Sequence, residues 1–160
     1  MEPPEPLRVA IVDHFGQPDA SPDDLELALR TAMAGGRGEV ALLLTDSDAV
    51  RDLNRRFRGL DEATDVLTFP SGIDRGGDVA ISVPDARRQA ALRGVPARDE
   101  TLFLAIHGGL HLMGLDDETE PERAAMVDRM NDVARAIGLP PDDAWASLLH
   151  ETAGSGEARA

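Results

Sequence analysis

One apolar stretch of the sequence carries two histidines, three glycines and two acids: Ile106-His107-Gly108-Gly109-Leu110-His111-Leu112-Met113-Gly114-Leu115-Asp116-Asp117. His107 and His111 are four residues apart, so an α-helix places both imidazoles on one face, with Cβ atoms roughly 5–6 Å apart. Gly114 follows where a helix can end in the left-handed conformation that glycine adopts at little cost. The chain can then double back and bring Asp117 to the two rings. The pattern predicts a metal site with the ligands His107, His111 and Asp117.

The residues around the histidines predict that this helix is buried. Apolar side chains occupy almost every face from Leu102 to Met113, which is typical of a helix in the centre of a fold. Two imidazoles inside such a helix need polar partners, because burying an unpaired polar group is costly. A single buried histidine is usually a hydrogen-bonded core residue. Here the spacing, the glycine and the following acid together favour a metal site.

Further apolar runs and helix-start signals predict an α+β fold. Strands are expected at 7–12, interpreted as a buried strand, and at 39–44, 65–70 and 78–83. Helices are expected to begin at Ser21–Pro22, at Asp46 or Ser47, at Pro84, near Asp99, and at Thr119, where Glu122 completes a capping box. The short connection between the last two strands allows a hairpin. We therefore expect a four-stranded mixed sheet packed with about five helices, with the metal-bearing helix buried centrally.

Length and composition indicate a single domain. One hundred and sixty residues can build one hydrophobic core. We expect the domain over 1–150, with Trp145 and Leu148–Leu149 packing near its end, and a disordered tail over 151–160. The absence of cysteine excludes disulfides and thiolate metal sites. We find no signal-peptide pattern and no apolar run of membrane-spanning length, so we expect a cytoplasmic protein without membrane contact.

The charge of the chain restricts how it could bind RNA. A formal charge of −14 argues against passive binding to nucleic acid, so any RNA contact requires a metal or a local basic patch. The densest positive cluster lies on the helix expected after Asp46. Its core face is predicted to hold Val50, Leu53 and Phe57. Its other face carries arginines that we interpret as solvated, Arg51, Arg55 and Arg56. Arg58 differs, because it lies at the helix exit before Gly59.

The metal-site stretch resembles the signature of the YbeY family of bacterial rRNA maturation endoribonucleases, which runs His-Gly-x-Leu-His-Leu-x-Gly-Tyr-Asp-His. Two upstream stretches are similar to other motifs of that family. Leu53 to Pro70 resembles Leu-Asn-x-x-Tyr-Arg-x-x-Asp-x-Pro-Thr-Asp-Val-Leu-Ser-Phe-Pro, and Gly77 to Ser82 resembles Gly-Asp-Ile-x-Ile-Ser. Leu115 in place of Tyr and Ala63 in place of Pro are minor departures.

This resemblance implies a cytoplasmic, zinc-dependent endoribonuclease for single-stranded RNA that acts in 16S rRNA 3′-end maturation and ribosome quality control. It implies one Zn²⁺ per chain, partners among rRNA, the ribosome or ribosomal proteins, and a role for Arg58 in RNA cleavage. The third family ligand is His, whereas this chain has Asp117. Two histidines and a carboxylate remain a competent zinc set, and the added charge favours harder metals such as Mn²⁺. His14 and His150 are alternative ligands, and Asp116 is a candidate for orienting one.

Three other functions fit parts of the pattern. A metzincin-like metalloprotease has similar ligand spacing, but such enzymes carry a general-base Glu directly after the first His, where this chain has Gly108. A non-catalytic ribosome-associated factor would keep the fold without the activity, and the acidity suits contact with basic ribosomal proteins. A purely structural metal site is disfavoured, because only three ligands are visible and structural zinc usually has four.

Overall fold

The computed structural model describes residues 6–71 and 76–146. These residues form a single α+β domain with the elements β1 (Arg8–Asp13), α1 (Pro22–Ala32), β2 (Glu39–Thr45), α2 (Ser47–Arg58), β3 (Val66–Pro70), β4 (Gly77–Ser82), α3 (Val83–Arg93), α4 (Ala97–Leu112) and α5 (Glu120–Ile137). The expected fold class is confirmed. The predicted tail at 151–160 and the pair Leu148–Leu149 lie outside the described residues. Among the described helices, none combines the length and apolar character that crossing a membrane requires.

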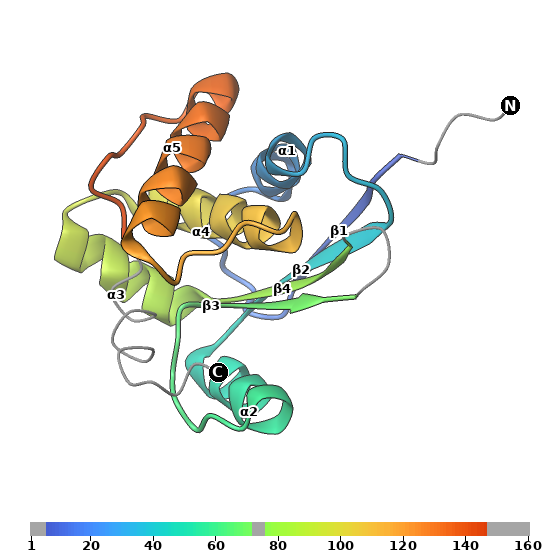
Figure 1. Cartoon of the computed structure of the whole chain (residues 1–160). Helices are drawn as coiled ribbons and strands as arrows, with labels where there is room; N and C mark the ends of the chain where they lie inside the picture. Colours follow the sequence, from blue (N-terminus) through green and yellow to red (C-terminus); the bar gives the residue numbers. More distant parts are fainter. Residues whose placement is uncertain (1–5, 72–75, 147–160) are drawn as a thin grey trace, which may run out of the picture.

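The four strands form one sheet in the order β1-β2-β4-β3 (Figure 1). β1 is parallel to β2 and β2 is parallel to β4, with Ala10 opposite Ala41 and Leu42 opposite Val79. β3 and β4 form the expected antiparallel hairpin, in which Thr68 pairs with Val79. The sheet is therefore mixed, as predicted, and β3 lies at one edge.

β1 lies at the other edge, which corrects the expectation of a buried strand. Val9 and Ile11 pack against the core, whereas Arg8, Ala10 and Val12 are exposed. On the face of the sheet that carries these exposed residues, the helix α2 packs on β3 and β4. A short apolar run occurs in both central and edge strands, so the sequence alone could not predict that β1 is an edge strand.

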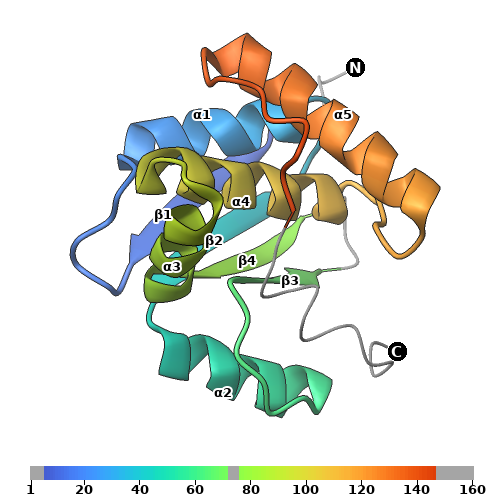
Figure 2. The same cartoon turned by 90° about the vertical axis from the view of Figure 1, so that its left-hand side faces the viewer.

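The helices cover the two faces of the sheet unequally (Figure 2). α1, α4 and α5 lie on one face and α2 lies on the other. The main core between the sheet and the first group is built from fully buried side chains that include Leu25, Leu29, Leu42, Ile81 and Ile106. α4 packs against α1, α3, α5, β3 and β4, and every residue from Glu100 to Leu110 is buried. The predicted central burial of α4 is confirmed.

α2 packs with a narrower face than its periodicity predicted. Val50 is buried in a small second core with Leu67 and Ala80. Phe57, which we expected on the core face, is 64% exposed, so that prediction is wrong. The buried residue of the following turn is instead Asn54, whose Nδ2 donates to the Glu62 carbonyl at 3.0 Å. α2 rests on β3 and β4 at one side of the sheet, and the residues of its last turn, from Arg55 to Arg58, are exposed.

Candidate metal centre

Two glycines let α4 approach its neighbours closely. A Cβ at Gly108 would lie 2.7 Å from Val79 Cγ1, and a Cβ at Gly109 would meet α1 side chains, the nearest at 3.2 Å. Gly108 therefore faces the sheet and Gly109 faces α1, which leaves another face of the helix for His107 and His111. A Glu at position 108, as the metzincin pattern requires, would collide with Val79.

A glycine turn returns the chain to the histidines. Gly114 has φ +100°, in the left-handed region that favours glycine, as expected. The Leu115 N–H donates to the Leu110 carbonyl at 3.1 Å and closes the turn. His111 Nδ1–H in turn donates to the Leu115 carbonyl at 2.8 Å. Because Nδ1 is used in this bond, Nε2, the atom that faces the other candidate ligands, is the ring nitrogen left to bind a metal.

The start of α5 anchors the loop that carries the third ligand. The expected capping box is present: Thr119 Oγ1 accepts from the Glu122 N–H, and Glu122 Oε1 accepts from the Thr119 N–H. One turn later, Arg123 Nη1 donates to the carbonyls of Asp117 and Glu118 at 3.3 and 3.1 Å. Asp117 is therefore held between the glycine turn and a capped helix.

The three predicted ligands converge on one point. Nε2 of His107 lies 3.0 Å from Nε2 of His111, and each of these atoms lies 3.4 Å from Asp117 Oδ2. A tetrahedral ion with bonds of about 2.0–2.1 Å holds its ligand atoms about 3.3–3.4 Å apart. The observed spacing fits one such ion. Within residues 6–71 and 76–146, no other His, Cys, Asp and Glu side chains form such a group.

Burial and mutual contact prepare these side chains for a cation. Burial lowers the pKa of His107, so its ring is neutral. Burial alone would raise the pKa of Asp117, but hydrogen bonds from the two rings outweigh it and hold that pKa well below its usual range. A neutral imidazole beside an ionised carboxylate is the protonation state that metal binding requires.

An aromatic side chain supports His107 from the far end of the described chain. Trp145 is only 6% exposed, and its ring centroid lies 4.9 Å from that of His107 and 6.5 Å from that of Phe103. Its indole N–H donates to Glu100 Oε2 at 3.0 Å. The sequence predicted that Trp145 packs, and this is confirmed. Its contact with the candidate ligand His107 was missed, because no local sequence pattern marks a contact between residues so far apart in the chain.

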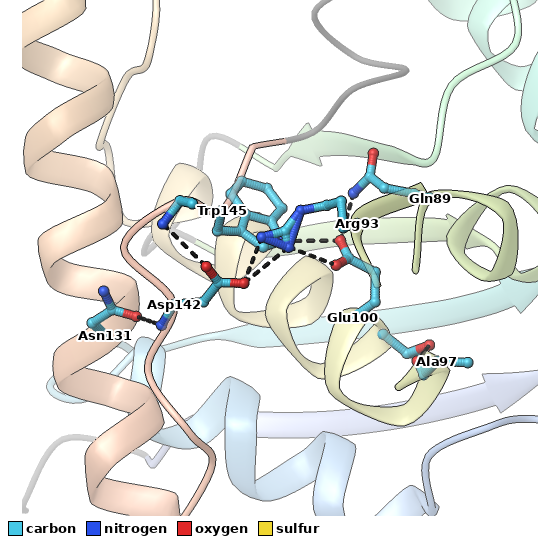
Figure 3. A network of polar contacts seen from close by, with 9 residues as sticks. Gln89, Arg93, Ala97, Glu100, Asn131, Asp142 and Trp145 are labelled. Carbon is cyan, nitrogen blue, oxygen red and sulfur yellow. Dashed lines mark hydrogen bonds and ion pairs between the residues drawn. The ribbon is translucent and has the colours of Figure 1, made fainter. Parts of the chain in front are cut away.

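The carboxylate that holds Trp145 belongs to a buried network between α3, α4 and the segment after α5 (Figure 3). Glu100 is fully buried and also accepts from Gln89, and its Oε1 lies 3.5 Å from Arg93 Nη1. Arg93 bridges onward to Asp142. Burial raises the pKa of Glu100 against the opposing effects of Gln89, Arg93 and Trp145. The network ties the segment after α5 to α3 and α4.

The other predicted residues do not join the three-ligand cluster. Arg58 is the exposed last residue of α2. In Figure 2, α2 and α4 run toward the same side of the molecule on opposite faces of the sheet. Asp116 is exposed, and the group that orients His111 is the Leu115 carbonyl. His14 is exposed beyond the end of β1, and His150 lies outside the described residues.

Comparison with known proteins shows the family of the chain. The family model described as Endoribonuclease YbeY matches residues 21–138. The chain belongs to the YbeY family. A YbeY from Moorella thermoacetica is 40% identical over 129 residues, covering 72% of this chain and 83% of the relative. A YbeY from Rhodopseudomonas palustris is 41% identical over 114 residues, covering 66% of this chain but 60% of the relative.

A solved structure has a similar fold. The solution structure of a Thermotoga maritima protein matches with a TM-score of 0.56 and 25% identity, covering 81% of this chain and 90% of the other. Within the YbeY signature, Asp117 stands where the third histidine is expected. Its carboxylate reaches both rings, so the site accommodates the substitution.

Proposed function

We propose that this YbeY-family chain is a metal-dependent endoribonuclease that hydrolyses single-stranded RNA. The convergence of two imidazole nitrogens and one carboxylate oxygen carries the proposal. Hydrolytic zinc sites use three protein ligands and keep a position open, whereas structural sites use four. The relatives named Endoribonuclease YbeY supply the class of substrate.

Each residue has one role in this proposal. His107, His111 and Asp117 hold the cation, and the Leu115 carbonyl keeps the His111 ring oriented. When bound, a divalent cation supplies Lewis acidity toward a phosphodiester and toward water. Arg58 presents a guanidinium whose paired N–H groups bind two phosphate oxygens.

The cation is one Zn²⁺ per chain, and Asp117 widens the choice of metal. A carboxylate is a harder ligand than an imidazole and adds a negative charge, which favours Mn²⁺ relative to a three-histidine site. The same charge makes the metal a weaker Lewis acid. We therefore expect activity with Zn²⁺ and detectable activity with Mn²⁺.

The cellular substrate in this proposal is rRNA, at the 3′ end of 16S rRNA, in the cytoplasm. The net charge of −14 favours contact with basic ribosomal proteins, while the metal and the arginines of α2 supply local positive charge for the RNA.

Cleavage of a labelled single-stranded RNA tests the proposal. The wild type is expected to cut the strand with metal but not with chelator, and to leave a matched duplex and a casein substrate intact. Asp117→Ala is expected to lose the metal and the activity, whereas Arg58→Ala loses activity with an unchanged metal content. A wild type that binds metal but cuts no RNA would instead be a non-catalytic ribosome factor. Chelator-resistant cleavage would also refute the proposal.

A further inference from the structure

Phe57 is a large aromatic side chain that the fold leaves in solvent. It lies in the last turn of α2, beside Arg58, with 64% of its surface exposed. Its ring meets that of Phe69 on β3 edge-to-face, with centroids 5.8 Å apart and an interplanar angle of 66°. The Arg56 guanidinium lies 5.6 Å from its centroid. Two neighbours therefore hold the ring while most of it stays open.

The ring lies among arginines on a protein with a formal net charge of −14. The last turn of α2 carries Arg55, Arg56 and Arg58. Asp52 pairs with Arg55 and Arg56, and residues 52–58 together carry three arginines and one aspartate. Sites for single-stranded nucleic acid combine aromatic faces for bases with positive charge for phosphates. The chain has few aromatic residues, 3% of its composition, so an exposed one among arginines is informative.

β3 connects this surface to the metal centre. Thr68 of β3 faces α4, where a Cβ on Gly108, the neighbour of His107, would lie 3.4 Å from Thr68 Cγ2. The next residue, Phe69, faces the other way and contacts Phe57. Since β3 is an edge strand, an extended RNA strand passing that edge can reach both sides of it. β3 therefore lies between the Phe57 ring and α4, the helix that carries His107 and His111.

We propose that Phe57 is a stacking platform for an unpaired base of the RNA, next to the phosphate that Arg58 binds. This inference rests on the proposed function and gives a physical reason why the protein would select single-stranded over double-stranded RNA. A base in a duplex is already stacked and paired, so it cannot offer a face to Phe57. An unpaired base can, whatever its identity.

Binding without metal tests the platform separately from cleavage. The probe is a fluorescein-labelled oligoadenylate, followed by anisotropy in the presence of chelator. Phe57→Ala is expected to weaken binding about 5- to 150-fold, and Phe57→Tyr to retain it. Leu92→Ala is the matched control, because Leu92 is also exposed, at 67%, and lies on α3. Its binding is expected to match the wild type.

Two further measurements identify the interaction as stacking. On an abasic strand of equal length, Phe57→Ala and wild type are expected to bind alike. The salt dependence of binding is expected to be unchanged in Phe57→Ala, whereas Arg58→Ala reduces the slope of log K against log salt by about 0.7. Phe57→Leu binding as well as wild type would overturn the platform, because leucine has no π-face.

The outcomes separate this inference from the proposed nuclease activity. A wild type that cleaves RNA while Phe57→Ala binds and cleaves normally would refute the platform alone. A wild type that cleaves nothing, yet binds oligoadenylate in a Phe57-dependent manner, would refute the nuclease and keep the platform. Thermal unfolding of each variant by circular dichroism confirms that the fold is intact.

Discussion

Replacing Trp145 separates its hydrogen bond from its packing. Trp145→Phe keeps an aromatic ring against His107 and Phe103 but removes the indole N–H that donates to Glu100. Trp145→Ala removes both the hydrogen bond and the ring. The two variants therefore measure how far the end of the described chain supports the metal helix.

The structure sets the size of both effects. A hydrogen bond to a charged group contributes about 1.5–3 kcal/mol, and a buried group that loses a partner is costly. We therefore expect Trp145→Phe to lower the free energy of unfolding by about 2 kcal/mol. Trp145 is 6% exposed, and truncating such a side chain to alanine costs about 3–5 kcal/mol. Trp145→Ala is also expected to weaken metal binding by about tenfold, because His107 loses its support.

Urea unfolding with chelator present, followed by far-ultraviolet circular dichroism, measures the stabilities. Competition with a chromophoric chelator measures metal affinity. Leu27→Ala, at a half-exposed position of α1, is the control and is expected to change stability by less than about 0.5 kcal/mol. A Trp145→Phe protein as stable as the wild type, or as unstable as Trp145→Ala, would refute the assigned roles of the N–H and the ring.

Three further changes test the site and its surroundings. Asp117→His is expected to raise the preference for Zn²⁺ over Mn²⁺ at least about tenfold in a competition titration, since it replaces a hard anionic ligand with a neutral one; an unchanged ratio would contradict this. Burial raises the pKa of Glu100 in the folded protein above its ordinary 4.5. The folded state therefore favours the protonated carboxyl, and the stability gained in this way is complete below about pH 4.5 and is lost as the pH rises through the pKa of the folded state. The stability of Glu100→Gln relative to wild type is therefore expected to increase with pH in this window, and a flat difference in urea unfolding would count against it. Gly108→Ala is expected to destabilise the protein, because its Cβ would lie 2.7 Å from Val79 Cγ1 and overpacking costs about 1–3 kcal/mol. In an exposed helix the same substitution stabilises by about 1 kcal/mol. If Gly108→Ala stabilised this protein by that amount, α4 would have to shift away from the sheet, and the prediction would be wrong.

The ligand cluster could be predicted because its determinants are local. His107, His111, Gly114 and Asp117 lie within one short segment, where helical periodicity and the conformational freedom of glycine largely determine their relative positions. The capping box at Thr119 and Glu122 is equally local. Such features depend on neighbours along the chain, so the pattern of residue types is sufficient.

Features that depend on distant segments could not be predicted. The periodicity of α2 placed Phe57 inward, but which face of a helix is covered depends on how much sheet lies beneath it. The insertion of β4 between β2 and β3 likewise has no local marker. Glu100 would ordinarily be assigned to the surface, and its burial reflects Gln89, Arg93 and Trp145, which arrive from other segments.

The position of Trp145 gives the protein an intrinsic optical signal. The chain contains one tryptophan, and its ring lies 4.9 Å from that of His107. All indole emission therefore comes from a single point beside a candidate ligand. Titrating a paramagnetic ion such as Co²⁺ should quench that emission in step with occupancy, and displacement by Zn²⁺ should restore it. Metal exchange at this centre can be followed in real time without attaching a dye.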